Sequence, residues 1–186
     1  MLEVNFSPFP ILVTDRLILR QVWQEDAPEM FFLRSDARIL KYISREPPTS
    51  IDEIHTYIQF LTDNADNNTG ITWGITLKNN DKVIGTIALW RLIKEHYRAE
   101  IGYIMNPEFY GKGIMHEAMV VVADYAFNVM GLHSIEANTH SANIESQRVL
   151  ERAGYIREAY FRESWCYKGV FSDRMIYSLI VPKNNA

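Results

Sequence analysis

The sequence predicts a mixed α/β, or α+β, fold with a twisted and mostly antiparallel sheet of about seven strands flanked by helices. Three runs with strand-like alternation follow one another between residues 71 and 105 and are joined by short polar turns. Further along the chain, two segments carry apolar residues at helical spacing, and more strands lie between and after them. Helices interspersed with strands of a largely antiparallel sheet are typical of this class.

Composition limits the number of domains and the kinds of partner. The chain has 186 residues, of which 47% are apolar, so we expect one domain over 1–186 with a core of about 14–181. The net charge is −4 and the basic residues are scattered, which argues against direct nucleic-acid binding. No apolar run could span a bilayer, so we expect a cytoplasmic protein. The lone Cys166 fits a reducing compartment and is expected to be a small core residue.

Individual elements can be assigned in chain order. Ser50 and Glu53 have the spacing of a capping box, which predicts that a helix begins there and runs to about Asp66. Gly131 is a natural end for the first of the two later helices. The expected strands are 16–22, 71–77, 82–92, 96–105 and 134–140, with a closing hairpin of 155–165 and 171–181; the expected helices are 23–35, 39–43, 51–66, 115–130 and 143–153.

A glycine-containing turn, Gly111-Lys112-Gly113, joins a strand to a helix. Free backbone N–H groups and the positive end of the helix dipole converge at such a turn, and glycine lets a phosphate approach the backbone closely. The alternative is an ordinary turn without a ligand. Ile114 stands where a Walker loop needs Ser or Thr, and His116 stands where a dinucleotide fingerprint needs a third glycine, so both motifs fail.

Four segments carry a resemblance to a known family. "TDRLILR" (14–20), "AEIGYIMNPEFYGKGIMHEA" (99–118), "NIESQRVLERAGY" (143–155) and "SDRMIYSL" (172–179) occur in the order found in the GNAT superfamily of acyl-coenzyme A N-acyltransferases. The sequence is most similar to the RimJ/RimL-like branch, which includes ribosomal-protein N-terminal acetyltransferases. The match covers nearly the whole chain, and it implies acetyl-CoA as cosubstrate and an amine as acceptor.

The resemblance also implies which residues bind the cofactor. The family's pyrophosphate loop, Arg/Gln-x-x-Gly-x-Gly/Ala, falls on Tyr110, Gly111, Lys112, Gly113, Ile114 and Met115, with departures at the first and last positions. The backbone of Ile104 and Met105 is implied to pair with the pantetheine arm as an added strand would. Asn143 and Ser146 are implied to face the pantetheine and thioester. Asn143 also suits a helix N-cap, and the two roles are compatible.

Catalytic candidates follow from the chemistry of acetyl transfer. In many family members an acidic residue on the strand of Glu100 accepts the amine proton, directly or through water; the alternative is a strand carboxylate in an ordinary salt bridge. Leu150 stands where many relatives have a tyrosine acid, so Ser146 is the candidate for assisting the thiolate, or else a plain helix hydroxyl. His116-Glu117 lacks the second histidine of a zinc helix, so no metal site is expected. We expect the histidines to be structural, and Trp73, Trp90 and Tyr103 to be mostly core residues; the alternative is that some of these aromatics line the acceptor groove.

The acceptor remains open at this stage. A protein N-terminus, a small amine, an aminoglycoside-like antibiotic and a lysine all suit the branch. An α-amine titrates near 7.7–8.0 and lysine near 10.4, so neutralising lysine costs about 3.5 kcal/mol more, which favours the α-amine. The alternative class is a sensor or scaffold that binds acyl-CoA without turnover. Relatives of this branch allow a homodimer, although the sequence carries no interface pattern.

Overall fold

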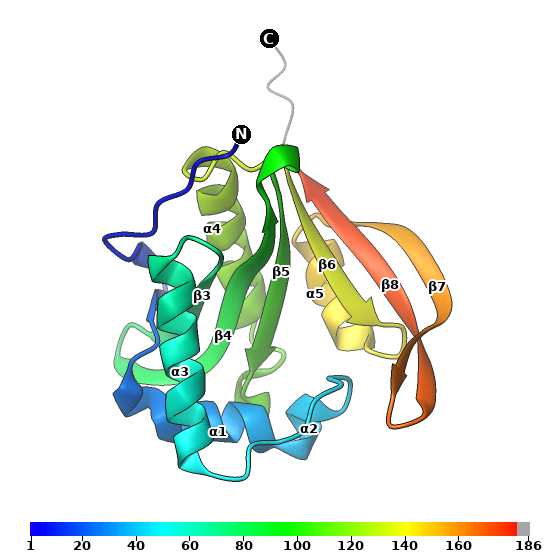
Figure 1. The fold of residues 1–186 in the computed structure, drawn as a ribbon, viewed down its shortest axis with the longest axis horizontal. Helices are drawn as coiled ribbons and strands as arrows, with labels where there is room; N and C mark the ends of the chain where they lie inside the picture. The colour runs from blue at the N-terminus through cyan, green and yellow to red at the C-terminus, as the bar shows by residue number, and fades with distance from the viewer. Residues whose placement is uncertain (182–186) are drawn as a thin grey trace.

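The computed structural model describes residues 1–181, and one eight-stranded sheet organises them in the order β1-β2-β3-β4-β5-β6-β8-β7 (Figure 1). The strands are β1 (Leu12–Val13), β2 (Leu17–Gln21), β3 (Ile71–Leu77), β4 (Asn80–Ile93), β5 (Arg98–Met105), β6 (Ser134–His140), β7 (Ile156–Tyr167) and β8 (Val170–Ile180). Every neighbouring pair is antiparallel except β5 and β6. The predicted meander and the closing hairpin are confirmed, and the two-residue β1 takes the sheet to eight strands.

Five helices and three short 3-10 turns complete the fold of residues 1–181. The helices are α1 (Ala27–Ser35), α2 (Ala37–Leu40), α3 (Ile51–Asp66), α4 (Ile114–Asn128) and α5 (Ile144–Arg152), and the turns are η1 (Gln24–Asp26), η2 (Lys94–His96) and η3 (Pro107–Phe109). Ser50 caps α3 as predicted, its hydroxyl accepting from the Glu53 N–H, but the Glu53 carboxylate accepts from Thr49 instead of closing the capping box. In residues 1–181 no helix is long and apolar enough to cross a membrane.

The helices cover the two faces of the sheet separately. Figure 1 shows α1, α2 and α3 in front of the strands, with α4 and α5 behind. The apolar side of α4 packs with residues of β2 to β6 in the larger core, whereas α1 and α3 form a second cluster around Val83 and Ile104 of the sheet. Side chains alternate between faces along a strand, so Glu100 and Gly102 share the face of Ile104, and Tyr103 lies on the face toward α5.

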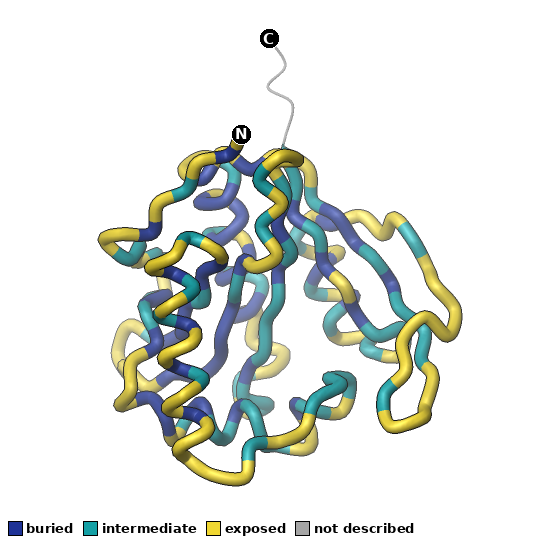
Figure 2. The backbone as a smooth tube through the Cα atoms, viewed as in Figure 1, coloured by how far each residue is buried: buried dark blue, intermediate teal, exposed yellow. Residues whose placement is uncertain are grey.

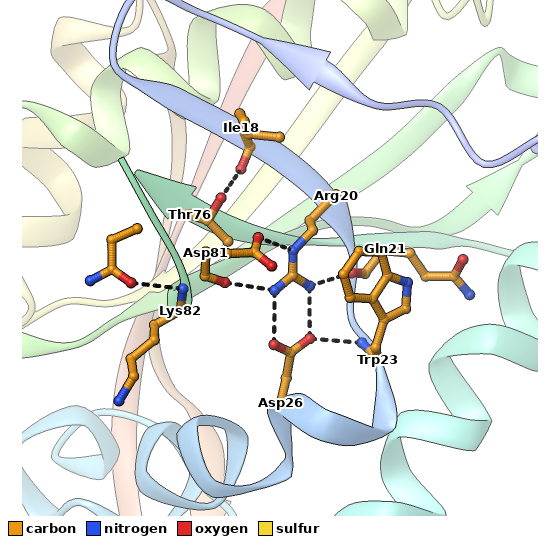
Figure 3. A network of polar contacts seen from close by, with 9 residues as sticks. Ile18, Arg20, Gln21, Trp23, Asp26, Thr76, Asp81 and Lys82 are labelled. Carbon is orange, nitrogen blue, oxygen red and sulfur yellow. Dashed lines mark hydrogen bonds and ion pairs between the residues drawn. The ribbon is translucent and has the colours of Figure 1, made fainter. Parts of the chain in front are cut away.

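A buried ion-pair network fixes where the chain leaves β2 (Figure 3). The Arg20 side chain is only 5% exposed, and it donates to both carboxylate oxygens of Asp26 at 2.8 and 2.9 Å. The same guanidinium donates to the carboxylate and carbonyl of Asp81 and to the carbonyl of Gln21, so each of its N–H groups is used. Asp26 also accepts from the Trp23 N–H, which anchors the start of α1 to the sheet.

The β7–β8 hairpin lies at the open edge of the sheet, and most of its residues are exposed (Figure 2). Cys166 is one of them, so the prediction that it is a core residue was wrong. β7 is an edge strand, and residues 160–166 at its tip are all exposed, so side chains on both faces of the strand there stay in solvent. Trp73 is fully buried as predicted, whereas Trp90 is 42% exposed and is not a core residue.

Candidate functional site

The two central strands of the sheet separate partway along their length. β5 and β6 pair from Arg98–Ser134 to Ile101–Ala137 and then part, although β5 continues to Met105 and β6 to His140. On its other side β5 stays paired with β4, where Thr86 lies opposite Ile104. The backbone of residues 102–105 therefore has one edge that pairs with no strand within residues 1–181. An extended ligand can bind such an edge by strand addition.

The glycine turn lies where β5 leads into α4, and its backbone donors are unused. None of the N–H groups from 111 to 116 donates to an acceptor within residues 1–181, although their neighbours at Tyr110 and Glu117 both do. Gly111 and Gly113 have φ angles of +73° and +74°, which only glycine adopts readily. Gly113 caps the 15-residue α4, so the positive end of the helix dipole adds to these donors. This arrangement is an anion-binding turn.

A pair of hydroxyl groups stands beside the gap between the strands. Asn143 caps α5, its side-chain oxygen accepting from the Ser146 N–H at 3.2 Å, so the N-cap role expected as an alternative is confirmed. The Ser146 hydroxyl lies 2.8 Å from the phenol oxygen of Tyr103 on β5. Burial raises the pKa of Tyr103 to about 12, so its phenol is protonated at neutral pH.

Glu100 is a carboxylate close to the point where β5 and β6 part. It lies one residue before the last paired position of β5, opposite Glu136 of β6, and its side chain is only 11% exposed. Its Oε2 accepts from Arg91 at 3.0 Å, because a bulge in β4 with a positive φ at Arg91 brings that residue beside it. Burial raises the pKa of Glu100, and the charge of Arg91 opposes this change. The expected salt bridge is therefore present, on a largely buried carboxylate.

Comparison with known proteins assigns a family to this fold and site. The model of the acetyltransferase (GNAT) domain matches residues 16–156. The chain belongs to the GNAT acetyltransferase family. An uncharacterized N-acetyltransferase of Bacillus subtilis, YoaA, is 35% identical over 94% of this chain and 99% of its own length. The ribosomal protein uS5 alanine N-acetyltransferase of Escherichia coli is 24% identical, covering 92% of this chain and 91% of its own. A GNAT acetyltransferase structure from Bacillus anthracis superimposes with a TM-score of 0.82 at 24% identity, over 92% of this chain and 98% of its own.

This family uses acetyl-CoA, and the residues of this GNAT chain fit it. The unused N–H groups of 111–116 suit the pyrophosphate, and the unpaired edge of residues 102–105 suits the pantetheine arm. A Cβ added at Gly111 would meet nothing within 4 Å, so the turn is open on that side. Contacts of the cofactor with the predicted binding set of Ile104, Met105, Tyr110 to Met115, Asn143 and Ser146 remain a prediction.

An ion-pair clasp holds the GNAT loop from the N-terminal side of the fold. Arg16 of the "TDRLILR" segment contacts both Glu117 of α4, with Nη2 at 2.6 Å, and the carbonyl oxygen of Lys112, with Nη1 at 3.0 Å. Thr14 donates to the same carboxylate. Burial acts to raise the pKa of Glu117, but the hydrogen bonds from Thr14 and Arg16 outweigh this effect, so the pKa is lowered. This clasp was not predicted from the sequence, where Glu117 was considered only as part of a zinc helix.

Two further features of the GNAT site differ from the sequence reading. Leu150, at the position of the tyrosine acid of many relatives, is fully buried, and Tyr103 supplies a phenol beside Ser146 instead. Tyr103 was expected among the core aromatics; its position on β5, on the face opposite Glu100, was the signal that could have placed it toward α5. Within residues 1–181, no cluster of three or more histidine, cysteine, aspartate or glutamate side chains could hold a metal ion.

Proposed function

We propose that this enzyme transfers the acetyl group of acetyl-CoA directly to a primary amine in a ternary complex, and that an α-amine is its preferred acceptor. The observation that carries the proposal is the position of Glu100, a largely buried carboxylate with a raised pKa at the point where β5 and β6 separate. A base beside the thioester site is what an ammonium acceptor needs, because only the neutral amine is nucleophilic.

Each group then has a distinct part in binding. The N–H groups of Gly111 to Met115 hold the pyrophosphate, and the side chains of Tyr110 and Lys112 flank it. The backbone of Ile104 and Met105 orients the pantetheine arm, with Asn143 and Ser146 on the opposite side at the start of α5. The bound cosubstrate supplies an acetyl group activated as a thioester.

Proton movements are assigned to side chains of the chain itself. Glu100 accepts the amine proton, directly or through one water. The Ser146 hydroxyl, hydrogen-bonded to Tyr103, directs a proton toward the leaving sulfur. Two hydroxyls joined by one hydrogen bond retain one O–H donor for a third group, so this pair can serve the thiolate without a residue at the Leu150 position.

The preference for an α-amine rests on the cost of deprotonation. An α-amine needs about 3.5 kcal/mol less than a lysine to become neutral at pH 7. The similarity to the ribosomal protein uS5 alanine N-acetyltransferase agrees with such an acceptor. A small amine or an amine-bearing antibiotic is the second acceptor class.

A thiol-release assay tests the proposal. Acetyl-CoA is mixed with the enzyme and a panel of peptides with free N-termini, the same peptides with blocked N-termini and an internal lysine, and small amines. Products are identified by mass spectrometry. We expect thiol release only with free α-amines or small amines. Binding of acetyl-CoA without turnover on any acceptor would instead favour the alternative of a non-catalytic acyl-CoA sensor.

A further inference from the structure

Three arginines on the side of the sheet that carries Glu100 have no carboxylate partner within residues 1–181. They are Arg34 of α1, Arg45 in the segment between α2 and α3, and Arg174 of β8, and none of them forms a salt bridge there. Two arginines toward the other end of the sheet differ, since Arg91 pairs with Glu100 and Arg98 pairs with Glu136. The chain as a whole carries a net charge of −4, so surplus carboxylates are available elsewhere.

Several guanidinium donors of these arginines are buried and unused. Nε and Nη2 of Arg45, and Nε of Arg174, are inaccessible to solvent and donate to no acceptor in residues 1–181. Burial, together with the like charge of Arg34, lowers the pKa of Arg45, although a guanidinium stays cationic at neutral pH. A buried cation without a partner is costly, and native proteins rarely retain one without a compensating anion.

Contacts between distant segments hold Arg174 and Arg34, and Arg34 is the charged neighbour of Arg45. The Nη2 of Arg174 lies 3.5 Å from the hydroxyl of Ser44, next to Arg45 in the chain. The guanidinium of Arg34 stacks 3.5 Å above the ring of Tyr57 of α3, and that of Arg174 lies 4.8 Å from the ring of Trp165. Aromatic faces hold the guanidinium planes but leave their in-plane N–H groups available to a ligand.

The segment that carries Arg45 is tied across to the hairpin. The Glu46 carboxylate accepts from the Tyr167 hydroxyl at 2.9 Å and pairs with Lys168 at 2.8 Å. In Figure 1 the segment after α2 reaches toward β8 from the front of the sheet. Residues 44–46 therefore bridge from the helical side to the hairpin, and Arg45 lies within this bridge.

The register of the strands relates this cluster to Glu100. Arg174 lies opposite His140 on β6, and Glu136 lies opposite Glu100. Glu136 and His140 are four residues apart and share a face, so the acidic and basic ends of this face are about 13 Å apart at the usual rise of a strand. This face presents carboxylates at one end and unpaired guanidinium groups at the other.

We propose that Arg45 and Arg174, supported by Arg34, bind an anionic group of the amine acceptor, either a carboxylate or a phosphate. The inference rests on the proposed function, because it describes the acceptor of the same reaction. The amine of such an acceptor lies toward Glu100, and its anion lies in the plane of the guanidinium N–H groups, which match the two oxygens of a carboxylate or phosphate. Acceptors with an amine and an anion on one short molecule or peptide are therefore preferred over neutral amines.

A binding experiment tests the anion site without requiring turnover. The melting temperature is measured with saturating CoA, which occupies the glycine turn, in sodium phosphate, sodium succinate or sodium chloride of equal ionic strength. Wild-type protein is compared with Arg45→Gln, Arg174→Gln and the control Arg38→Gln, which alters an exposed arginine paired with Asp36. We expect phosphate or succinate to raise the melting temperature of wild type and Arg38→Gln, and this rise to vanish in Arg45→Gln and Arg174→Gln.

The melting temperatures of the same variants also show whether Arg45 binds a ligand or stabilises the fold. In chloride alone, Arg45→Gln should melt at or above the wild-type temperature, because it removes a partly buried charge whose Nε and Nη2 have no acceptor within residues 1–181. If Arg45 instead stabilised the fold, its substitution would lower the melting temperature. A lower melting temperature of Arg45→Gln in chloride, or equal stabilisation of wild type and Arg45→Gln by both anions, would overturn the proposal.

Kinetics with matched acceptors identify the source of the anion. One pair is a tetrapeptide with Asp or Asn at its second position, and the other is 3-aminopropyl phosphate or 3-aminopropanol. We expect at least one pair to show a KM about tenfold to a hundredfold lower for the anionic member, a difference that Arg45→Gln abolishes while kcat changes little. Measurable transfer with equal KM within both pairs would overturn the proposal. Absence of transfer to any amine contradicts the proposed function instead, and the melting experiment then decides the anion site.

Discussion

The phenol oxygen of Tyr103 lies 2.8 Å from the hydroxyl oxygen of Ser146, joining β5 to the first turn of α5 beside the gap between β5 and β6. Burial raises the pKa of Tyr103 to about 12, so the pair keeps both protons throughout the neutral range. The two hydroxyls therefore act as one donor unit, and a change in either should affect the other's function.

Tyr103→Phe and Ser146→Ala test this unit. Each is expected to lower kcat by about a hundredfold, the typical cost of losing one donor to a developing charge, and the double variant should be no slower than the slower single variant. The loss should be similar at every pH because the thioester does not titrate. The measurement is steady-state kinetics with one acceptor, with CoA affinity from calorimetry as the control. Losses that multiply in the double variant would show that the residues act separately.

Glu100 and Arg91 predict a shift in the pH–rate profile. Burial raises the pKa of Glu100 and Arg91 opposes the rise, so Arg91→Gln should raise this pKa further and move the acid limb of kcat/KM to higher pH. Glu100→Gln should lower turnover most near and below neutral pH, with a loss that shrinks as alkaline pH deprotonates the amine. An unmoved acid limb in Arg91→Gln, or a loss in Glu100→Gln that is the same at all pH values, would remove Glu100 as the base.

The buried network around Arg20 predicts a large effect on stability. Asp26→Ala leaves the Arg20 guanidinium buried without its bidentate partner, so the free energy of unfolding should fall by about 3–5 kcal/mol. Asp81→Asn is the matched control, because its side chain is 72% exposed and such pairs contribute about 1 kcal/mol or less. Urea denaturation measures both. Similar losses of unfolding free energy in the two variants would contradict the expectation that the buried Asp26 contact contributes more than the exposed Asp81 contact.

Local patterns in the sequence predicted most of the fold. The 71–77 and 134–140 strands and the 51–66 helix match the structure, because alternation, helical spacing and the Ser50 cap are properties of adjacent residues. Helix 39–43 was misplaced because Asp36 caps an earlier turn, so α2 is Ala37–Leu40. The exposure of Cys166 and Trp90 could not be predicted, since it depends on which helix covers which strand.

The candidate site likewise has local features that the sequence predicted and long-range contacts that it did not. The glycine turn is a local motif, and the structure has its N–H groups free as the sequence predicted. The Tyr103–Ser146 pair and the Arg16–Glu117 clasp join residues 43 and 101 positions apart in the chain. Contacts of this length depend on the order of strands in the sheet, and no spacing rule in a single sequence encodes them.

The central claim is that the turn from 111 to 116 binds the cosubstrate through its backbone. Gly113→Ala and Gly131→Ala form a matched pair at the two ends of α4, because both glycines have a φ of +74° and an added Cβ at either meets only one ordinary contact, at 3.6 and 3.8 Å. Both variants should lose about 1–2 kcal/mol of stability from the left-handed conformation.

Calorimetric titration with CoA is the most direct measurement. Alanine at position 113 disfavours the left-handed turn that aims the N–H groups together, so the Kd of Gly113→Ala should rise at least about tenfold, which corresponds to about 1.4 kcal/mol. The Kd of Gly131→Ala should equal that of wild type. An unchanged Kd in Gly113→Ala, or the same rise in both variants, would contradict the claim that this turn holds the cofactor.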